Sequence, residues 1–415
     1  MRQPGALRAV IGCREFSGLW ISATVSTAGD QLAAVALSLL VFERTRSPAW
    51  TALTYAMMTL PTLVSGPLLA WMADRYPRRA VMLCCAWLQA GLVAAMALPG
   101  TPLPAMIALL IAVQMVASPF LAAQEATLPL VLPPKHYDDG IALFGSSADL
   151  AQMVGLASAG VVATAFGPHV ALAADAVTFV LVAVLVQVTV LPRPAAAPVR
   201  VRRVTPDGSP APHAPLDGGA LGLIFGSPRL RSILGLRLLA GFAMVPQGLA
   251  VPLATQLRAP WAAGLILAVE PAANVLGVLL LYRLVRDERR RERLVGPLAV
   301  LSLAPLVVLA AHPNLVGTVT LLALAAMAGA YHTPARSAWG RIMPNAYRGR
   351  AHGIARTALR ASQGGGMALG GVLAQLLGSV STAVAGAGGV GVLLALRAAL
   401  GWNRARRIAN AEVTT

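Results

Sequence analysis

Residues 66–79 read Gly66-Pro67-Leu68-Leu69-Ala70-Trp71-Met72-Ala73-Asp74-Arg75-Tyr76-Pro77-Arg78-Arg79, a charged turn between two long apolar stretches. A fainter copy of this turn returns 211 positions later. A constant offset of this kind, kept over about a hundred residues, is typical of two structurally equivalent halves. The offset relates Gly66 to Gly277, Arg75 to Arg286, Arg78 to Arg289, Arg79 to Arg290, Pro133 to Pro344, Gln152 to Gln363, Gly155 to Gly366 and Gly160 to Gly371.

The composition indicates an integral membrane protein. Hydrophobic residues make up 57% of the chain and charged residues 12%, whereas a soluble domain is about 25% charged. About 20 apolar residues are needed for a helix to cross the hydrocarbon core. The sequence therefore predicts an all-α fold of twelve transmembrane helices, six per half. Suitable runs lie near residues 17–42, 50–72, 80–98, 102–124, 142–166, 168–191, 232–257, 261–282, 294–311, 315–333, 353–378 and 379–400.

The basic residues predict the orientation, because Lys and Arg near the ends of membrane spans remain in the cytoplasm. With a cytoplasmic N-terminus, only Arg44, Arg46 and Arg258 of the 33 basic residues face outside, and Arg237 falls within a span, close enough to its cytoplasmic end to snorkel. Both termini are therefore expected in the cytoplasm. The net charge of +17 is explained by this topology, so no nucleic-acid partner is expected.

Composition also divides the chain into domains. Residues 192–217 are rich in Pro, Ala and Arg and predict a flexible cytoplasmic linker. Residues 1–191 form the first six-helix bundle. Residues 218–402 form the second, led by a short amphipathic helix at the membrane surface. Residues 403–415 are expected to form a cytoplasmic tail.

The turn at 66–79 resembles motif A of the major facilitator superfamily, a charged loop between spans two and three. Within that family the chain is similar to the drug-efflux branch that includes macrolide exporters, through Gly29-Asp30-Gln31-Leu32, Gly66-Pro67-Leu68 and Pro334-Ala335-Arg336. The resemblance implies two pseudo-symmetric six-helix bundles and secondary active transport. We expect export of a hydrophobic small molecule or drug, coupled to protons, with import or uniport of a small solute as the alternative.

Charges at the cytoplasmic side suggest two latches between the halves. In the family, the motif A aspartate contacts the start of span eleven, which the resemblance places on Asp74 with Arg356 or Arg360, beside Arg75, Arg78 and Arg79. The offset of 211 carries Asp149 to Arg360, so charge is reversed at equivalent positions. We therefore hypothesise a second latch between Asp149 and Arg286 or Arg289. The alternative is that these charges only set the topology.

Two of the acids within the predicted spans are candidates for the transport pathway. Asp30 is near the middle of the first span, and Glu270 lies in the eighth, followed by Pro271. A carboxylate at this depth is costly, so it either changes protonation, meets a cationic substrate or packs as a neutral group. We expect Asp30 and Glu270 to couple protons to substrate, and Asp175 to lie near the outer end of its span and meet water. The expected polar lining of the cavity is Gln31, Gln152, Asn274 and Gln363, although intramembrane amides also join helices.

Other classes of function fit less well. The six histidines lie in loops and at span ends without a paired acid, which disfavours an enzyme, and no Gly-rich Lys-Ser/Thr loop is present for ATP. Cys13, Cys84 and Cys85 lack metal-ligand spacing. No catalytic residue, cofactor or metal is expected, and the partners are a small-molecule substrate, protons and the lipid bilayer. We expect a monomer in a bacterial cytoplasmic membrane; a non-transporting membrane sensor remains the alternative of another class.

Overall fold

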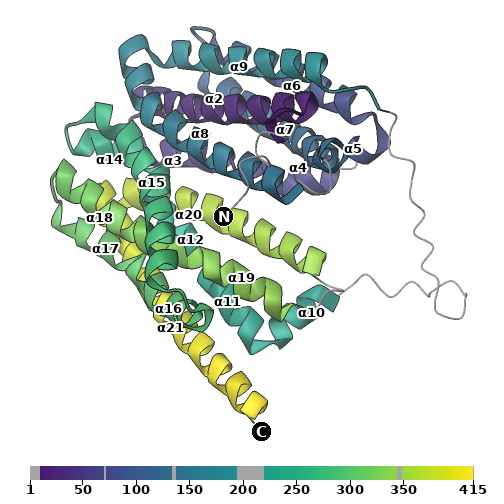
Figure 1. The fold of residues 1–415 in the computed structure, drawn as a ribbon. Coiled ribbons are helices and arrows are strands. Elements are labelled where there is room, and N and C mark those ends of the chain that lie inside the picture. Colours follow the sequence, from purple (N-terminus) through teal and green to yellow (C-terminus); the bar gives the residue numbers. More distant parts are fainter. Residues whose placement is uncertain (1–9, 70–71, 133–136, 194–218, 344–347, 415) are drawn as a thin grey trace, which may run out of the picture.

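The computed structural model describes residues 10–69, 72–132, 137–193, 219–343 and 348–414, and in these ranges the regular structure is helical, without strands. The side chains of Asp74 and Asp149 lie outside what it describes, as does the predicted linker over 194–218. The helices form two bundles, one from each half of the chain (Figure 1). This is the all-α architecture that the sequence predicts.

The first half contains eight described helices. They are α2 (Arg14–Thr45), α3 (Pro48–Met57), α4 (Pro61–Leu69), α5 (Met72–Arg75), α6 (Arg78–Ala97), α7 (Leu103–Val131), α8 (Tyr137–Phe166) and α9 (Pro168–Thr189). One predicted span, residues 50–72, is broken between α3 and α4, where Pro61 begins the second piece. The break is consistent with the missing N–H of proline, which cannot continue a helical hydrogen-bond ladder.

The second half begins with α10 (Gly219–Gly226), where the sequence predicts an amphipathic helix. The helices that follow are α11 (Pro228–Leu238), α12 (Ala240–Ala243), α13 (Val245–Gly248), α14 (Ala250–Gln256), η2 (Pro260–Ala262), α15 (Ala263–Leu284), α16 (Glu288–Leu301), α17 (Ala304–Val307), η3 (Val308–Ala311), α18 (Leu315–Ala328), η4 (Gly329–Tyr331), α19 (His332–Ile342), α20 (Arg348–Leu377) and α21 (Val380–Thr414). Helix α21 continues through most of the segment expected to be a tail.

Eight described helices are long and apolar enough to cross a membrane, and a ninth is obtained if the pieces of residues 228–256, bent by 48°, count as one span. The other three predicted spans are helical as well. They fall on α3 with α4, on α8 and on α20. Helices α3 and α4 are each too short to cross alone, and α20 carries several arginines in its first half.

Glycines allow the two bundles to approach closely. A Cβ on Gly160 of α8 would lie 2.8 Å from the backbone nitrogen of Gly264 in α15. A Cβ on Gly371 of α20 would crowd Ala52 of α3. These contacts follow the 211-residue repeat. Gly160 corresponds to Gly371, and Gly264 corresponds to residue 53, which is next to Ala52. The two halves therefore meet through two equivalent helix pairs, α8 with α15 and α20 with α3 (Figure 1).

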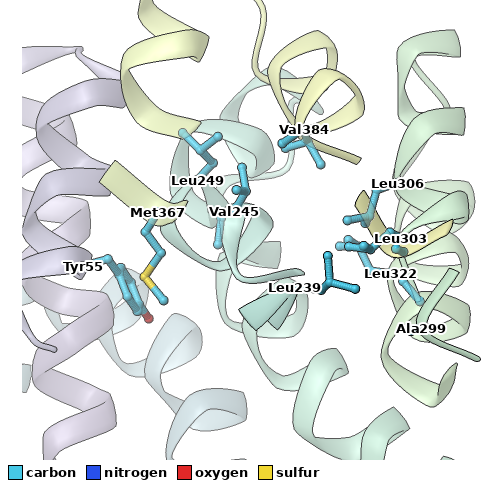
Figure 2. Packing of buried hydrophobic residues seen from close by; sticks show 14 of the residues in the cluster. Tyr55, Leu239, Val245, Leu249, Ala299, Leu303, Leu306, Leu322, Met367 and Val384 are labelled. Atoms are coloured by element: carbon cyan, nitrogen blue, oxygen red, sulfur yellow. The ribbon is translucent and has the colours of Figure 1, made fainter. Parts of the chain in front are cut away.

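The packed interior continues across this interface. The largest cluster of buried apolar side chains lies mainly in the second half, with Leu239, Leu303 and Leu322 among its members, and it also includes Tyr55 of α3. Figure 2 shows Tyr55 beside Met367 of α20, next to the group around Val245 and Leu249. Two smaller clusters fill the first bundle alone.

Candidate functional site

A cavity of about 470 Å³ lies between the two bundles and is lined by both. We call it the central cavity. The repeat-related pair Gln152 and Gln363 lines it, and so do Asp30 and Glu270, one carboxylate from each half. The other lining residues are Gln31, Ala34, Tyr55, Met58, Thr59, Gln114, Met244, Gln247 and Met367.

A second cavity, of about 210 Å³, adjoins the central cavity inside the second bundle. The two share Met244, Gln247, Glu270 and Gln363 as wall residues. Asn274, predicted to line the pathway, lies here rather than in the central cavity, and its Nδ2 donates a 3.3 Å hydrogen bond to the carbonyl of Ala326. The predicted polar residues thus border connected spaces.

Asp30 lies in the middle of α2, and its exposed side chain faces the central cavity. Its neighbour Gly29 packs against Asp175 and Thr178 of α9, with no room for a Cβ. This contact brings a second carboxylate within electrostatic range of Asp30. The expectation that Asp175 meets water is wrong: its side chain is 2% exposed, and it accepts a 3.0 Å hydrogen bond from the Thr178 hydroxyl.

Glu270 lies in α15 just before Pro271. Because proline has no N–H, the carbonyl of Leu267, four residues earlier, loses its helical partner. Leu267 lines the smaller cavity together with Glu270. The sequence Glu270-Pro271 therefore places a carboxylate at the wall of the smaller cavity and frees a main-chain acceptor in another residue of that wall.

Tyr55 is a lining residue that the sequence did not single out. Its side chain is 6% exposed, and its hydroxyl has no hydrogen-bond partner among the described residues. The ring lies against Met367 from the opposite bundle (Figure 2). A buried hydroxyl without a partner is costly, so Tyr55 is available to bond a molecule in the cavity.

The arginines of the motif A turn hold the first bundle together. Arg78 donates a 2.7 Å hydrogen bond to the carbonyl of Ala126 in α7, and Arg79 donates one of 2.7 Å to the carbonyl of Gln187 in the last turn of α9. Arg75 also makes an interaction within the described structure. These bonds tie the start of α6 to two neighbouring helices of its own bundle.

Of the residues in the two predicted latches, the structure describes the side chains of the arginines. Arg360 of α20 donates a 3.1 Å hydrogen bond to the Thr62 hydroxyl of α4, with Glu125 within electrostatic range. The side chains of Arg356, Arg286 and Arg289 are exposed. Because the side chains of Asp74 and Asp149 lie outside the described structure, both latches stay predictions.

Nothing in the described part of the chain resembles a metal centre, since no group of three or more His, Cys, Asp or Glu side chains gathers there. The chemistry of the central cavity is that of a binding chamber. Two carboxylates, five amides and the hydroxyls of Tyr55 and Thr59 outnumber the apolar side chains of its wall, which are Ala34 and three methionines. Such a wall offers many hydrogen bonds, and the adjoining smaller cavity, lined mostly by aliphatic side chains, can hold an apolar part of a bound molecule.

Comparison with known proteins gives the same fold. A family model described as the Major Facilitator Superfamily matches residues 19–325. A curated relative, the uncharacterized MFS-type transporter YkuC of Bacillus subtilis (strain 168), is 25% identical over 188 residues, 45% of this chain. That match spans only 44% of the relative's length.

Solved structures resemble the chain over nearly its whole length. A bacterial homolog of the human lysosomal transporter Spinster, inward-facing and unoccupied, superposes with a TM-score of 0.72 at 14% identity and covers 95% of this chain and 97% of that one. The peptide transporter POT in complex with sulfate gives 0.73 at 14% identity, over 95% of each chain. The nucleoside transporter NupG gives 0.70 at 15% identity, over 93% of this chain and 98% of that one. At these identities the likeness shows the fold alone.

Proposed function

Because the chain belongs to the major facilitator superfamily, a family of transporters, we propose that it exports a hydrophobic small molecule or drug by proton-coupled alternating access. The observation that carries this proposal is the placement of Asp30 and Glu270, from opposite halves, in one central cavity. No described Lys, Arg or His lines that cavity. Each carboxylate must therefore be neutralised by a proton or by a cationic group of the substrate.

The aliphatic wall of the smaller cavity and the methionines of the central cavity support a substrate with a hydrophobic part. Three methionines, Met58, Met244 and Met367, line the central cavity, and their flexible side chains adapt to apolar surfaces of varied shape. The amides and the Tyr55 hydroxyl supply a few hydrogen bonds. The resemblance of Gly29-Asp30-Gln31-Leu32 to macrolide exporters supports the same assignment.

The interface supports alternating access. The glycine contacts hold the bundles together at α8 with α15 and at α20 with α3. The arginine-rich loops belong to the cytoplasmic side by the positive-inside rule, with both termini there and the protein in the cytoplasmic membrane. Rocking of one bundle against the other would then expose the central cavity to each side in turn.

Transport into everted membrane vesicles tests the proposal. In a panel of hydrophobic antibiotics that tests macrolides and amphiphilic acids as separate classes, at least one class should accumulate when a proton gradient is imposed and stop accumulating when a protonophore is added. Asp30→Asn should abolish this gradient-driven accumulation, and Glu270→Gln should reduce it. Glu43→Gln is the matched control, because Glu43 is an exposed acid of the same helix α2 outside the cavity.

Other outcomes would identify the alternatives. Unchanged export by Asp30→Asn would remove this residue from proton coupling. Uptake in the opposite direction, or flux that ignores the proton gradient, would indicate an importer or a uniporter. Binding without any flux in proteoliposomes would indicate a sensor.

A further inference from the structure

A third cavity, of about 470 Å³, lies within the second bundle and has basic walls. We call it the basic pocket. Arg237 of α11 lines it together with His332 and Arg336 of α19. Its remaining wall is Ala240, Asn274, Val275, Val278, Leu279, Thr333, Leu359 and Gln363. No described Asp or Glu belongs to this wall, so the basic side chains face one another without an acid among them.

Arg237 is the deepest of these groups. The expectation that it snorkels to the cytoplasmic surface is wrong, because its side chain is only 8% exposed. Its guanidinium carbon lies 6.0 Å from the ring centroid of the fully buried Trp339. Its Nη1 atom has no hydrogen-bond partner among the described residues. Arg237 is therefore a buried cation that the described protein does not neutralise.

A neighbouring charge increases this cost. Arg336 lies within electrostatic range of Arg237. A buried charge is stable only when it is paired, and a guanidinium pairs best with the two oxygens of a carboxylate or phosphate. The site therefore lacks an anion, and its geometry suits an oxyanion.

The basic pocket is continuous with the substrate spaces. Gln363 lines the basic pocket and the central cavity, and Asn274 lines the basic pocket and the smaller cavity. Along this path Asp30 and Glu270 line the central cavity and the arginines line the basic pocket, while the smaller cavity is lined by both Glu270 and His332. A molecule long enough to reach both would meet apolar and polar walls at one end and cations at the other.

We propose that the basic pocket binds a carboxylate or phosphate group carried by the transported molecule, whose apolar body lies in the smaller cavity, where most wall residues are aliphatic. The proposal rests on the proposed function in that it names the chemical class of the substrate, an amphiphilic anion. Arg237 pairs with the oxyanion from within the protein, and the exposed Arg336 pairs with it from the pocket mouth.

Binding to the purified full-length protein tests the proposal without any transport. The probes are octanoate and octyl phosphate, with octanol as the uncharged probe of the same chain length, titrated by calorimetry in an uncharged detergent. The two anions should bind more tightly than octanol. Arg237→Gln should weaken anion binding about tenfold or more, since a charge-assisted bond is lost, and leave octanol binding unchanged.

Two further variants keep the test decisive. Arg336→Gln removes an exposed guanidinium and should also weaken anion binding, even if Arg237→Gln fails to fold. Arg397→Gln is the matched control, because Arg397 is an exposed arginine of α21 outside the basic pocket. Equal binding of octanoate and octanol, or full anion affinity in both Arg237→Gln and Arg336→Gln, would overturn the proposal.

The oxyanion could also come from a lipid headgroup, and nanodiscs separate the two sources. In nanodiscs of neutral phosphatidylcholine, octyl phosphate should bind as it does in detergent. If phosphatidylglycerol added to the nanodiscs abolishes this binding in wild type, the pocket holds a lipid headgroup and the assignment to the substrate is wrong. If the anions bind but everted vesicles show no export, the anion site in the basic pocket is supported and only the proposed function is overturned.

Discussion

Ser47, at the N-terminus of α3, donates a 2.9 Å hydrogen bond to the Oε1 atom of Gln375, near the end of α20. The two residues are 328 positions apart and belong to different bundles. The same Ser47 hydroxyl accepts a 3.3 Å hydrogen bond from the backbone N–H of Trp50 and so caps α3. One side chain thus starts a helix of the first bundle and fastens it to the second.

Cross-linking these two positions should stop transport. In a variant without native cysteines, Ser47→Cys with Gln375→Cys places two thiols at this contact, and a short bifunctional thiosulfonate should join them. The halves could then no longer separate at this point. We expect export to cease on cross-linking and to return when a reductant is added.

Each single cysteine variant, treated with the same reagent, serves as the control and should keep its activity. Full transport by the cross-linked double variant would show that the α3 and α20 contact does not open during the cycle.

Gly264→Leu should drive the bundles apart where α8 meets α15. A Cβ at Gly264 would lie 2.7 Å from the backbone nitrogen of Gly160, and main chain cannot yield as a flexible side chain can. The distance between spin labels on α8 and α15 should therefore increase, and transport should fall. Gly145→Leu, at an exposed site of α8 with open space around it, should change neither. An unaltered distance in Gly264→Leu would contradict the contact.

Arg78→Ala should destabilise the first bundle. It removes the 2.7 Å hydrogen bond to the Ala126 carbonyl, and bonds from charged donors contribute about 1.5–3 kcal/mol. The repeat offers a matched control in Arg289→Ala, since Arg289 occupies the equivalent place but has an exposed side chain. Thermal unfolding in detergent should show a lower Tm for Arg78→Ala alone; equal shifts would mean that the bond to α7 is not stabilising.

The second predicted latch can be tested by exchanging its charges. Asp149→Arg and Arg289→Asp should each impair transport, because each places like charges at the latch. The double variant restores an opposite pair and should recover part of the lost rate. Arg290→Asp, at the neighbouring exposed position, is the control and should not rescue Asp149→Arg. A double variant no better than either single one would dismiss this latch.

The repeat made part of the interface predictable. Its pair Gly160 and Gly371 packs across the interface, on Gly264 and Ala52, whereas the pair Gly155 and Gly366 packs within the bundles, on Ala28 and Gly241. Gly364 also crosses the interface to Leu60, Gly370 packs on Val245 of its own bundle, and Gly365 faces open space. Glycines three or four residues apart share one face of a helix, but which glycine touches a partner depends on how the helix is rotated.

The candidate site was only partly predictable. Asp30 and Glu270 were found because charge is rare within membrane spans, and the structure places both in the central cavity. Tyr55 was missed because a tyrosine in a span carries no such signal. The burial of Asp175 and Arg237 was predicted wrongly, because it was judged from their distance along the span to the membrane surface. Burial depends instead on the helices packed around a residue; Asp175, for example, is covered where α9 packs against Gly29.

Gly160 and Gly264 touch through main-chain atoms, so no side-chain rotamers are interlocked at their contact. One helix can rotate against the other there without first displacing an interdigitated side chain. We therefore expect a low activation barrier for rotation at this point, and we expect contacts farther from it to decide which state is favoured. Substitutions at this pair would slow the exchange between states, whereas substitutions at the periphery would change their populations.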